Sequence, residues 1–166
     1  MGQVEINNYE DLYNVLDQIN EKIDWDTFYS KRNRKAPILL NNTLPDKAIA
    51  TFIKTHPIEN AIEFGCGEGR NAVYLAKNGI DVLAVDSSDI AIKNAKEIAK
   101  DLKNVQFICN DFLSIDLKDT RYDLVVDSGM FHHLAPHRRL QMAFLSFYAF
   151  LLMPVERMNL MICSFI

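Results

Sequence analysis

A short strand that ends directly in a glycine-rich turn constrains this chain more than any other feature. Residues 61–64 form an apolar run that contains one glutamate, and glycines follow at positions 65, 67 and 69. Glycine has no Cβ and tolerates positive φ, so the turn can be tight and its backbone can approach a ligand closely. A helix is expected at residues 71–77, and the free N–H groups at its start would face polar ligand atoms. The sequence therefore predicts a ligand-binding turn between a buried strand and a helix.

The rest of the chain alternates short apolar strands with helical segments. This alternation is typical of an α/β fold, in which helices cover both faces of a parallel sheet. At 166 residues the chain has the length of a single domain. We expect residues 1–57 to form an N-terminal helical cap and residues 58–166 to form the core. Strands are expected at 61–64, 80–85, 105–109, 122–126 and 160–165, and helices at 8–20, 24–29, 45–55, 71–77, 89–102 and 136–153.

Composition and charge narrow the functional classes. Lys and Arg total 18 against 22 Asp and Glu, a formal net charge of -4, so the chain lacks the basic footprint of a nucleic-acid-binding protein. Its three cysteines are too few and too far apart for a disulfide framework or a paired-cysteine zinc site. The N-terminus is polar and acidic, and the longest apolar stretch is shorter than the ~18 to 20 residues that cross a bilayer. We expect a cytoplasmic protein with no nucleic-acid and no membrane partner.

Polar side chains stand where the second and third strands are expected to end. Asp86 follows the second strand, where a carboxylate can accept two hydrogen bonds from a ribose diol. Asn110, Asp111 and Phe112 follow the third strand and offer an amide, a carboxylate and a ring to the edge and face of an adenine. Since the carboxyl ends of parallel strands converge on one crevice, the sequence predicts a nucleoside-containing ligand there.

The spacing of the glycines argues against a nicotinamide cofactor. A dinucleotide fingerprint needs its third glycine at position 70, where this chain has Arg70, so the pattern is GxGxG and not GxGxxG. An NAD-dependent oxidoreductase is therefore the disfavoured alternative.

Four motifs together resemble the class I S-adenosylmethionine-dependent methyltransferases: EFGCGEG, the acid in LAVD, NDF, and VVDSGMFHHL. GCGEGRNAVYLA with DSGMFHHLAPHRR is similar to a small-molecule branch related to thiopurine and tellurite methyltransferases. The resemblance spans about Trp25 to Ala149. It implies a three-layer Rossmann-like methyltransferase fold with a mostly parallel sheet and a small-molecule acceptor. It also implies S-adenosyl-L-methionine as cofactor and S-adenosyl-L-homocysteine as product.

The resemblance also implies roles for residues. Gly65 and Gly67 would lie against the cofactor, with Glu63 near its methionine amino group. Asp86 would hold the ribose hydroxyls, and Asp111 the adenine amino group. The whole expected cofactor-binding set is Glu63, Gly65, Cys66, Gly67, Asp86, Ser87, Asn110, Asp111, Phe112 and Ser128.

Further positions complete the predicted cofactor site. By the same resemblance, Phe112 would lie in the adenine ring region and Ser128, just past the fourth strand, would line the methionine moiety. Trp25, Phe28 and Tyr29 match an N-terminal segment that often folds over the cofactor in such enzymes.

Two adjacent histidines follow the fourth strand. Methyl transfer is an in-line displacement at an activated carbon, so the protein mainly aligns the reactants, excludes water and removes a proton where needed. His132 and His133 are the candidate catalytic residues, because a histidine can accept a proton near neutral pH. For each, packing under the loop or capping the next helix is the alternative. A metal site that adds His137 is disfavoured, because adjacent histidines diverge and no further ligand is suitably spaced, so no metal is expected.

The C-terminal region shapes one further expectation. The resembling family has seven strands and this sequence shows five, so we expect the last two strands to be lacking. The exposed edge of the fifth strand and a helix that is apolar almost all round predict a homodimer through the C-terminal helix and strand. One alternative is that the last ~14 residues come from a truncation or frameshift and were not selected for folding. The alternative function is a truncated, catalytically impaired S-adenosylmethionine-binding domain. The acceptor and its reacting atom are not identified by the sequence.

Overall fold

A five-stranded parallel sheet forms the centre of the computed structural model, which describes residues 5–19, 24–31, 44–117, 122–151 and 162–164. The strand order is β3-β2-β1-β4-β5, and every neighbouring pair is parallel. The expected parallel α/β sheet is therefore confirmed. The strands are β1 (Asn60–Phe64), β2 (Asp81–Asp86), β3 (Val105–Cys109), β4 (Leu124–Ser128) and β5 (Ile162–Ser164).

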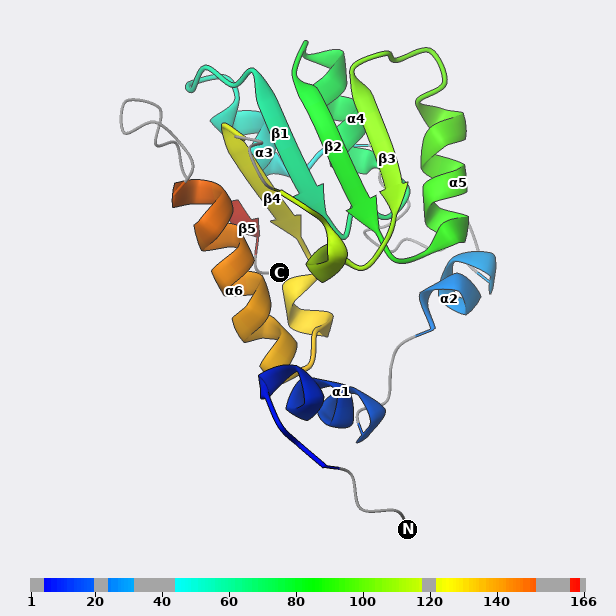
Figure 1. Cartoon of the computed structure of the whole chain (residues 1–166). Helices are drawn as coiled ribbons and strands as arrows, with labels where there is room; N and C mark the ends of the chain where they lie inside the picture. Colours follow the sequence, from blue (N-terminus) through cyan, green and yellow to red (C-terminus); the bar gives the residue numbers. More distant parts are fainter. Residues whose placement is uncertain (1–4, 20–23, 32–43, 118–121, 152–161, 165–166) are drawn as a thin grey trace.

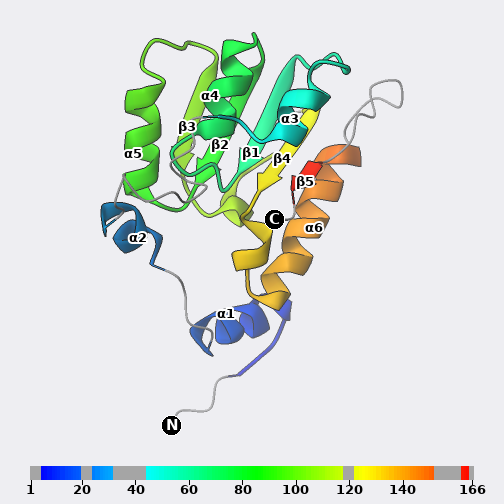
Figure 2. The same cartoon turned by 180° about the vertical axis from the view of Figure 1, so that it is seen from behind.

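Helices cover both faces of this sheet and complete the three layers (Figures 1 and 2). Helices α3, α4 and α5 lie on one face, and α6 lies on the other. The short 3-10 helices η2 and η3 follow the carboxyl ends of β3 and β4. The helices are α1 (Tyr9–Ile19), α2 (Trp25–Lys31), α3 (Lys47–Phe52), α4 (Arg70–Lys77), α5 (Asp89–Ile98), η2 (Phe112–Ser114), η3 (Phe131–His133) and α6 (Pro136–Leu151).

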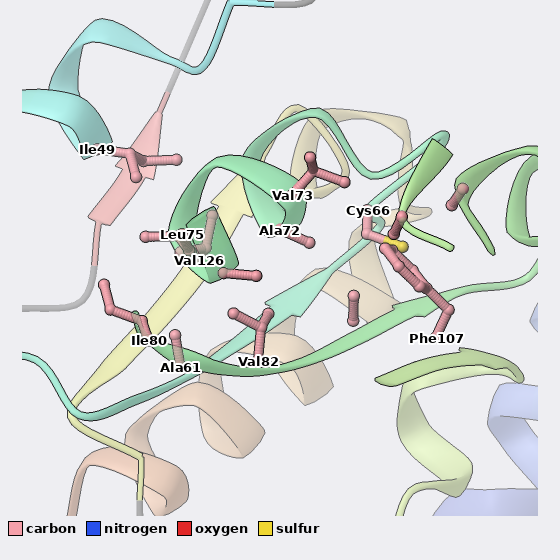
Figure 3. Packing of buried hydrophobic residues seen from close by; sticks show 14 of the residues in the cluster. Ile49, Ala61, Cys66, Ala72, Val73, Leu75, Ile80, Val82, Phe107 and Val126 are labelled. Carbon is pink, nitrogen blue, oxygen red and sulfur yellow. The ribbon is translucent and has the colours of Figure 1, made fainter. Parts of the chain in front are cut away.

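The strands divide their side chains between two hydrophobic cores. Successive residues of a strand point to opposite faces, so Ala61 belongs to the core under α4 and α5, whereas Ile62 and Phe64 belong to the core under α6. Val126 and Val125 of β4 divide in the same way. Figure 3 shows the first of these cores. Burial on both faces explains why the strand sequences are continuous apolar runs.

Several elements end at residues other than those predicted, and two of these differences bear on the site and the core. β4 runs to Ser128, so Asp127 and Ser128 lie within the strand and not after it. The helix expected to reach residue 102 ends at Ile98. Leu102 still packs against the first core, because a turn in which its N–H donates to the carbonyl of Ala99 at 2.8 Å brings it back to the sheet.

The N-terminal helices divide between the core layer and the carboxyl edge of the sheet. Ile49 of α3 is fully buried in the first core, whereas α1 and α2 lie below the ends of the strands in Figure 1. Asp17 of α1 accepts hydrogen bonds from Arg138 of α6 and is 2.8 Å from Nε2 of His137. The boundary expected at residue 57 therefore groups α3, a helix of the core layer, with two helices of the edge.

Candidate functional site

The turn after β1 needs its glycines for conformation and for space. Gly65, Gly67 and Gly69 have φ of +66°, +54° and +81°, a region that L side chains rarely adopt. A Cβ at Gly65 would lie 2.5 Å from the Cβ of Met130, and one at Gly67 would lie 2.6 Å from the hydroxyl oxygen of Tyr29. The turn is thus closely approached by the segment after β4 and by α2.

Glu63 ties this turn to the helix that follows it. Its side chain is 2% exposed, and its two carboxyl oxygens accept hydrogen bonds from Nδ2 of Asn71 and the N–H of Ala72, each at 2.9 Å. Burial raises the pKa of Glu63 to about 8, although both hydrogen bonds act in the opposite direction. In this structure the carboxyl group fixes β1 against α4, and its expected place near a cofactor amino group stays a prediction.

Asp86, at the end of β2, faces the same turn. Its Oδ2 accepts a hydrogen bond from the N–H of Gly67 at 2.7 Å, and its Oδ1 accepts one from the N–H of Ser88 at 2.9 Å. Burial is the main cause that raises its pKa. The carboxylate has four lone pairs, and the N–H groups of Gly67, Ser87 and Ser88 interact with it, so it keeps acceptor capacity for a ligand hydroxyl. Asp86 therefore supports the turn and retains the capacity predicted for ribose binding.

Two residues of the predicted cofactor site turn their side chains into the cores. Cys66 is 6% exposed and lies among the side chains of the first core (Figure 3), where burial raises the pKa of its thiol. Phe112 is 8% exposed and packs edge-on against Phe64, with ring centroids 6.3 Å apart. Any contact of these two residues with a ligand in the crevice would come from their backbone.

Three other residues of the predicted cofactor site are exposed at the ends of β2 and β3. These are Ser87, Asn110 and Asp111. The N–H of Asn110 donates to the carbonyl of Asp86 at 2.9 Å, which joins the two strand ends. Oδ1 of Asp111 accepts from the N–H of Leu113 at 3.0 Å and so caps η2. Polar side chains are thus accessible where an adenine was predicted.

Ser128, at the end of β4, belongs to a chain of polar contacts. Its hydroxyl accepts a hydrogen bond from Arg70 at 3.2 Å and donates one to Asp46 at 3.4 Å. The N–H of Asp46 donates to Oδ1 of Asn71 at 2.9 Å, and Asn71 is also the partner of Glu63. The sequence analysis missed Asp46 and Asn71, although the position of Asn71 directly behind the glycine turn was a usable signal.

Asp127 is a second buried carboxylate that the sequence analysis missed. It is 3% exposed, and its Oδ1 accepts hydrogen bonds from the N–H groups of Met130 and Phe131 at 2.9 and 3.3 Å. Within the described part of the chain its Oδ2 has no hydrogen-bond partner. Burial raises the pKa of this group. The signal was an acid directly after an apolar run, but the strand was expected to end one residue earlier.

The two histidines lie on η3, and both are exposed. Their ring centroids are 3.9 Å apart, and the ring of Trp25 stands edge-on to His133 at 5.0 Å. Burial and the neighbouring His132 lower the pKa of His133. The neutral imidazole of His133 is thus favoured near pH 7, which is the form that can accept a proton.

Helix α2 connects the two sides of the candidate site. Oδ1 of Asp26 accepts hydrogen bonds from the hydroxyl of Ser88 at 2.6 Å and the N–H of Ile90 at 3.3 Å, at the start of α5. Trp25 packs on His133 and Tyr29 lies against Gly67. The N-terminal segment predicted to cover the site therefore contacts both the glycine turn and the loop after β4.

Metal clusters and membrane-spanning helices are both absent from the described residues. Within those residues, no three His, Cys, Asp or Glu side chains gather where they could hold a metal ion. Among the described helices, none combines the length and the apolar character needed to cross a membrane.

Comparison with known families agrees with this geometry. Residues 61–151, more than half of the chain, match the family described as a methyltransferase domain. The chain belongs to this methyltransferase family. The matched residues include the glycine turn, the ends of β2, β3 and β4, and all of α6.

The curated relatives match over part of their length. An uncharacterised methyltransferase of Schizosaccharomyces pombe is 36% identical over 77 residues, which is 46% of this chain and 53% of that protein. The 2-heptyl-1-hydroxyquinolin-4(1H)-one methyltransferase of Mycobacteroides abscessus is 34% identical over 77 residues, 45% of this chain and 34% of that one. The chain thus spans about half of the first relative and a third of the second.

Solved structures share the fold. The structure from work on conversion of a disulfide bond into a thioacetal group during echinomycin biosynthesis has a TM-score of 0.63 and 28% identity. It covers 74% of this chain and 52% of that one. Phosphoethanolamine N-methyltransferase 1 of Haemonchus contortus has a TM-score of 0.57 and 19% identity. This match covers 84% of this chain and 29% of that one. The Rossmann-like methyltransferase fold expected from the sequence is confirmed.

Proposed function

We propose that this protein transfers a methyl group from S-adenosyl-L-methionine to a small-molecule acceptor. The observation that carries the proposal is the pairing of the Gly67 N–H with the Asp86 carboxylate across a turn of left-handed glycines. The residues fit a nucleoside with an amino-acid tail, because Asp86 keeps free acceptor positions and Asn110 and Asp111 are exposed beside it. Several relatives and structural neighbours are named as methyltransferases, which supports the same reaction.

The chain's own residues would do four things in this reaction. Asp86 binds the ribose hydroxyls, while Glu63 holds the glycine turn in place for the cofactor tail. Asp111 takes the exocyclic amino group of the adenine. Helix α2 covers the site and excludes water. When bound, the cofactor supplies a methyl carbon activated by a positively charged sulfur.

The loop after β4 would handle the acceptor. His133 accepts a proton at an imidazole nitrogen from a hydroxyl, thiol or amine acceptor, and partial burial together with the neighbouring His132 lowers the pKa of His133. Because a thiolate needs no base, the His133→Ala variant should slow the methylation of alcohols more than that of thiols. Equal slowing of both acceptor classes at unchanged cofactor affinity would argue for a positioning role.

The narrower substrate branch also belongs to this proposal. The names of the relatives above do not specify a thiopurine or tellurite substrate, so the acceptor screen should include a hydroxyquinolone together with thiols and chalcogen oxyanions. Nucleic acid is the least suitable acceptor for a chain with a net charge of -4.

Isothermal titration with S-adenosylmethionine, S-adenosylhomocysteine and NADH tests the cofactor assignment. We expect micromolar binding of the first two and none of NADH. Binding without transfer to any acceptor would instead support a cofactor-binding domain without turnover. A folded chain that binds neither sulfur ligand would overturn the proposal.

We also propose a cytoplasmic homodimer that uses α6 and β5. Leu140 and Phe144 on α6 are 54% and 66% exposed, so this helix offers apolar surface to a second copy of the chain. Sedimentation of the chain over a hundredfold concentration range tests the assembly, and a constant monomer mass would exclude it.

A further inference from the structure

A cavity lies beside the carboxyl edge of the sheet. Of its lining residues, only Asp111 has been given a role in the candidate cofactor site. Its volume is about 660 Å³, and its lining residues come from α1, η2 and α6 and from Asp111. Pockets for small molecules are typically ~300 to 1,000 Å³. Asp111, a residue of the candidate cofactor site, is part of its lining. The cavity therefore adjoins the cofactor site and has the size of a second small-molecule site.

The charge around this cavity is negative. Glu10 of α1 and Asp111 line it, and Arg138 of α6 is the single cation among the described lining residues. The guanidinium of Arg138 is already engaged, because it donates to Asp17 at 3.0 Å and to Gln141 at 2.8 Å. Asp17, Asp111 and Glu10 all act on Arg138 and raise its pKa. Three carboxylates thus surround one engaged guanidinium.

This balance persists when the neighbouring histidine is counted. His137 faces Asp17 at 2.8 Å, so a protonated His137 would add one positive charge. Three carboxylates against two cations still leave a net negative charge beside the cavity. A ligand carboxylate would be repelled there, whereas an ammonium group would be attracted.

The remaining wall of the cavity is partly apolar. Leu113 of η2 and Phe144 and Leu145 of α6 contribute to it, and the Phe144 side chain is 66% exposed. A large exposed aromatic side chain beside a cavity offers apolar surface that a ligand can cover. The wall therefore suits a molecule with an apolar body as well as a cationic group.

We propose that this cavity binds a small molecule that carries a protonated amine next to an apolar body, at a second site beside the cofactor crevice. The proposal rests on the function proposed above. Glu10 and Asp111 face the amine, and Phe144 covers the apolar body. Asp17, by binding Arg138 and His137, holds α1 in place as the outer wall.

Direct binding to the full chain tests this site without requiring turnover. We would titrate 4-phenylbutylamine, 4-phenylbutanol and 4-phenylbutyrate, which share one apolar body and differ in their head group. The amine is expected to bind at least fivefold more tightly than the alcohol, and the acid most weakly. Equal affinities for the three compounds, or no binding of the amine, would overturn the proposal.

Charge reversal at the cavity wall sharpens the test. Glu10→Lys should weaken the amine at least fivefold and strengthen the acid, with the alcohol unchanged. Phe144→Ala should weaken all three compounds by a similar factor. Glu97→Lys makes the same charge change at an exposed position of α5 and should change none of them. A Glu10→Lys variant that behaves like Glu97→Lys would remove the cavity as the site.

Competition with the cofactor product separates this proposal from the previous one. The amine should remain bound in the presence of saturating S-adenosylhomocysteine, with less than the fivefold loss of affinity expected for Glu10→Lys, because the two ligands occupy neighbouring sites that share Asp111. Displacement of the amine would mean that the cavity holds the adenine of the cofactor, which overturns a second ligand site there. If S-adenosylhomocysteine does not bind at all, the proposed function fails, while the amine series still reports on the cavity.

Discussion

The buried carboxylates in the two halves of the carboxyl edge of the sheet differ in their hydrogen bonding. At the ends of β1 and β2, every carboxyl oxygen of Glu63 and Asp86 accepts a hydrogen bond from the chain. At the end of β4, Asp127 is equally buried, yet within the described residues one of its oxygens has no partner. In the first half every carboxyl oxygen is already used to hold the chain together, whereas in the second half one carboxyl oxygen is buried without a partner among the described residues. The candidate catalytic histidines lie beside this second half.

The largest effect on stability should come from removing the hydrogen bonds of Glu63. Glu63→Ala leaves the buried donors of Asn71 and Ala72 unpaired, so the free energy of unfolding should fall by about 3 kcal/mol or more. Urea denaturation measures this change. The control is Glu68→Ala in the same turn, which removes one partly buried contact with Asn94 and should cost less than about 1 kcal/mol. Equal losses of unfolding free energy in the two variants would contradict the proposed role of Glu63 in holding β1 against α4.

Asp86 should contribute both to the structure of the turn and to cofactor binding. Asp86→Asn keeps an oxygen acceptor but removes the charge, so affinity for S-adenosylhomocysteine should fall by about 1.5 to 3 kcal/mol. Isothermal titration measures it, with circular dichroism to confirm folding. Asp81→Asn, at the exposed opposite end of β2, is the matched control. Unchanged affinity in Asp86→Asn would take this carboxylate out of the cofactor site.

The dependence of stability on pH should report on Glu63. Its pKa is raised to about 8 in the folded chain, so between about pH 4.5 and 8 the folded state holds a proton that the unfolded state has lost. The unfolding free energy should therefore decrease as pH rises through this window, with a contribution of up to about 1.4 kcal/mol per pH unit, and level off above it.

Glu63→Gln carries no titratable proton and provides the comparison for this slope. Asp86 and Asp127 have raised pKa values as well and contribute in the same direction at lower pH. Urea denaturation at a series of pH values should give a shallower slope for Glu63→Gln than for the wild type. Parallel slopes would show that Glu63 ionises normally.

The smallest effect on stability is expected at Asp127. Asp127→Asn keeps the oxygen that accepts from Met130 and Phe131 and removes the cost of burying a charge, so the unfolding free energy should change by less than about 1 kcal/mol. Thermal or urea denaturation checks this value against Glu63→Ala. A loss as large as that of Glu63→Ala would mean that both halves of the edge are structural.

The first two strands and the glycine turn could be predicted from the sequence, for a physical reason. Strands buried on both faces are continuous apolar runs, and the glycine turn has few backbone solutions, so β1, the turn that joins it to α4, and β2 were located within one residue. The end of β4 was misplaced because Asp127 and Ser128 are polar, and polar residues usually follow a strand. That error hid the second buried carboxylate.

Contacts between distant segments were beyond sequence reasoning. The approach of Tyr29 to Gly67 and of Asp26 to Ser88 depends on how α2 lies on the finished edge. Similarly, the inward side chains of Cys66 and Phe112 follow from strand register and packing, which local residue pattern alone does not specify. The residue types at the site were thus predictable, but their partners were not.

The edge-on packing of Trp25 against His133 has an optical consequence. Trp25 is the only tryptophan of the chain, so all indole fluorescence originates at the candidate site. Protonation of the adjacent imidazole, or movement of α2 as a ligand enters, should change the intensity and wavelength of this emission. The native chain therefore carries its own reporter of events at this edge, with no label needed.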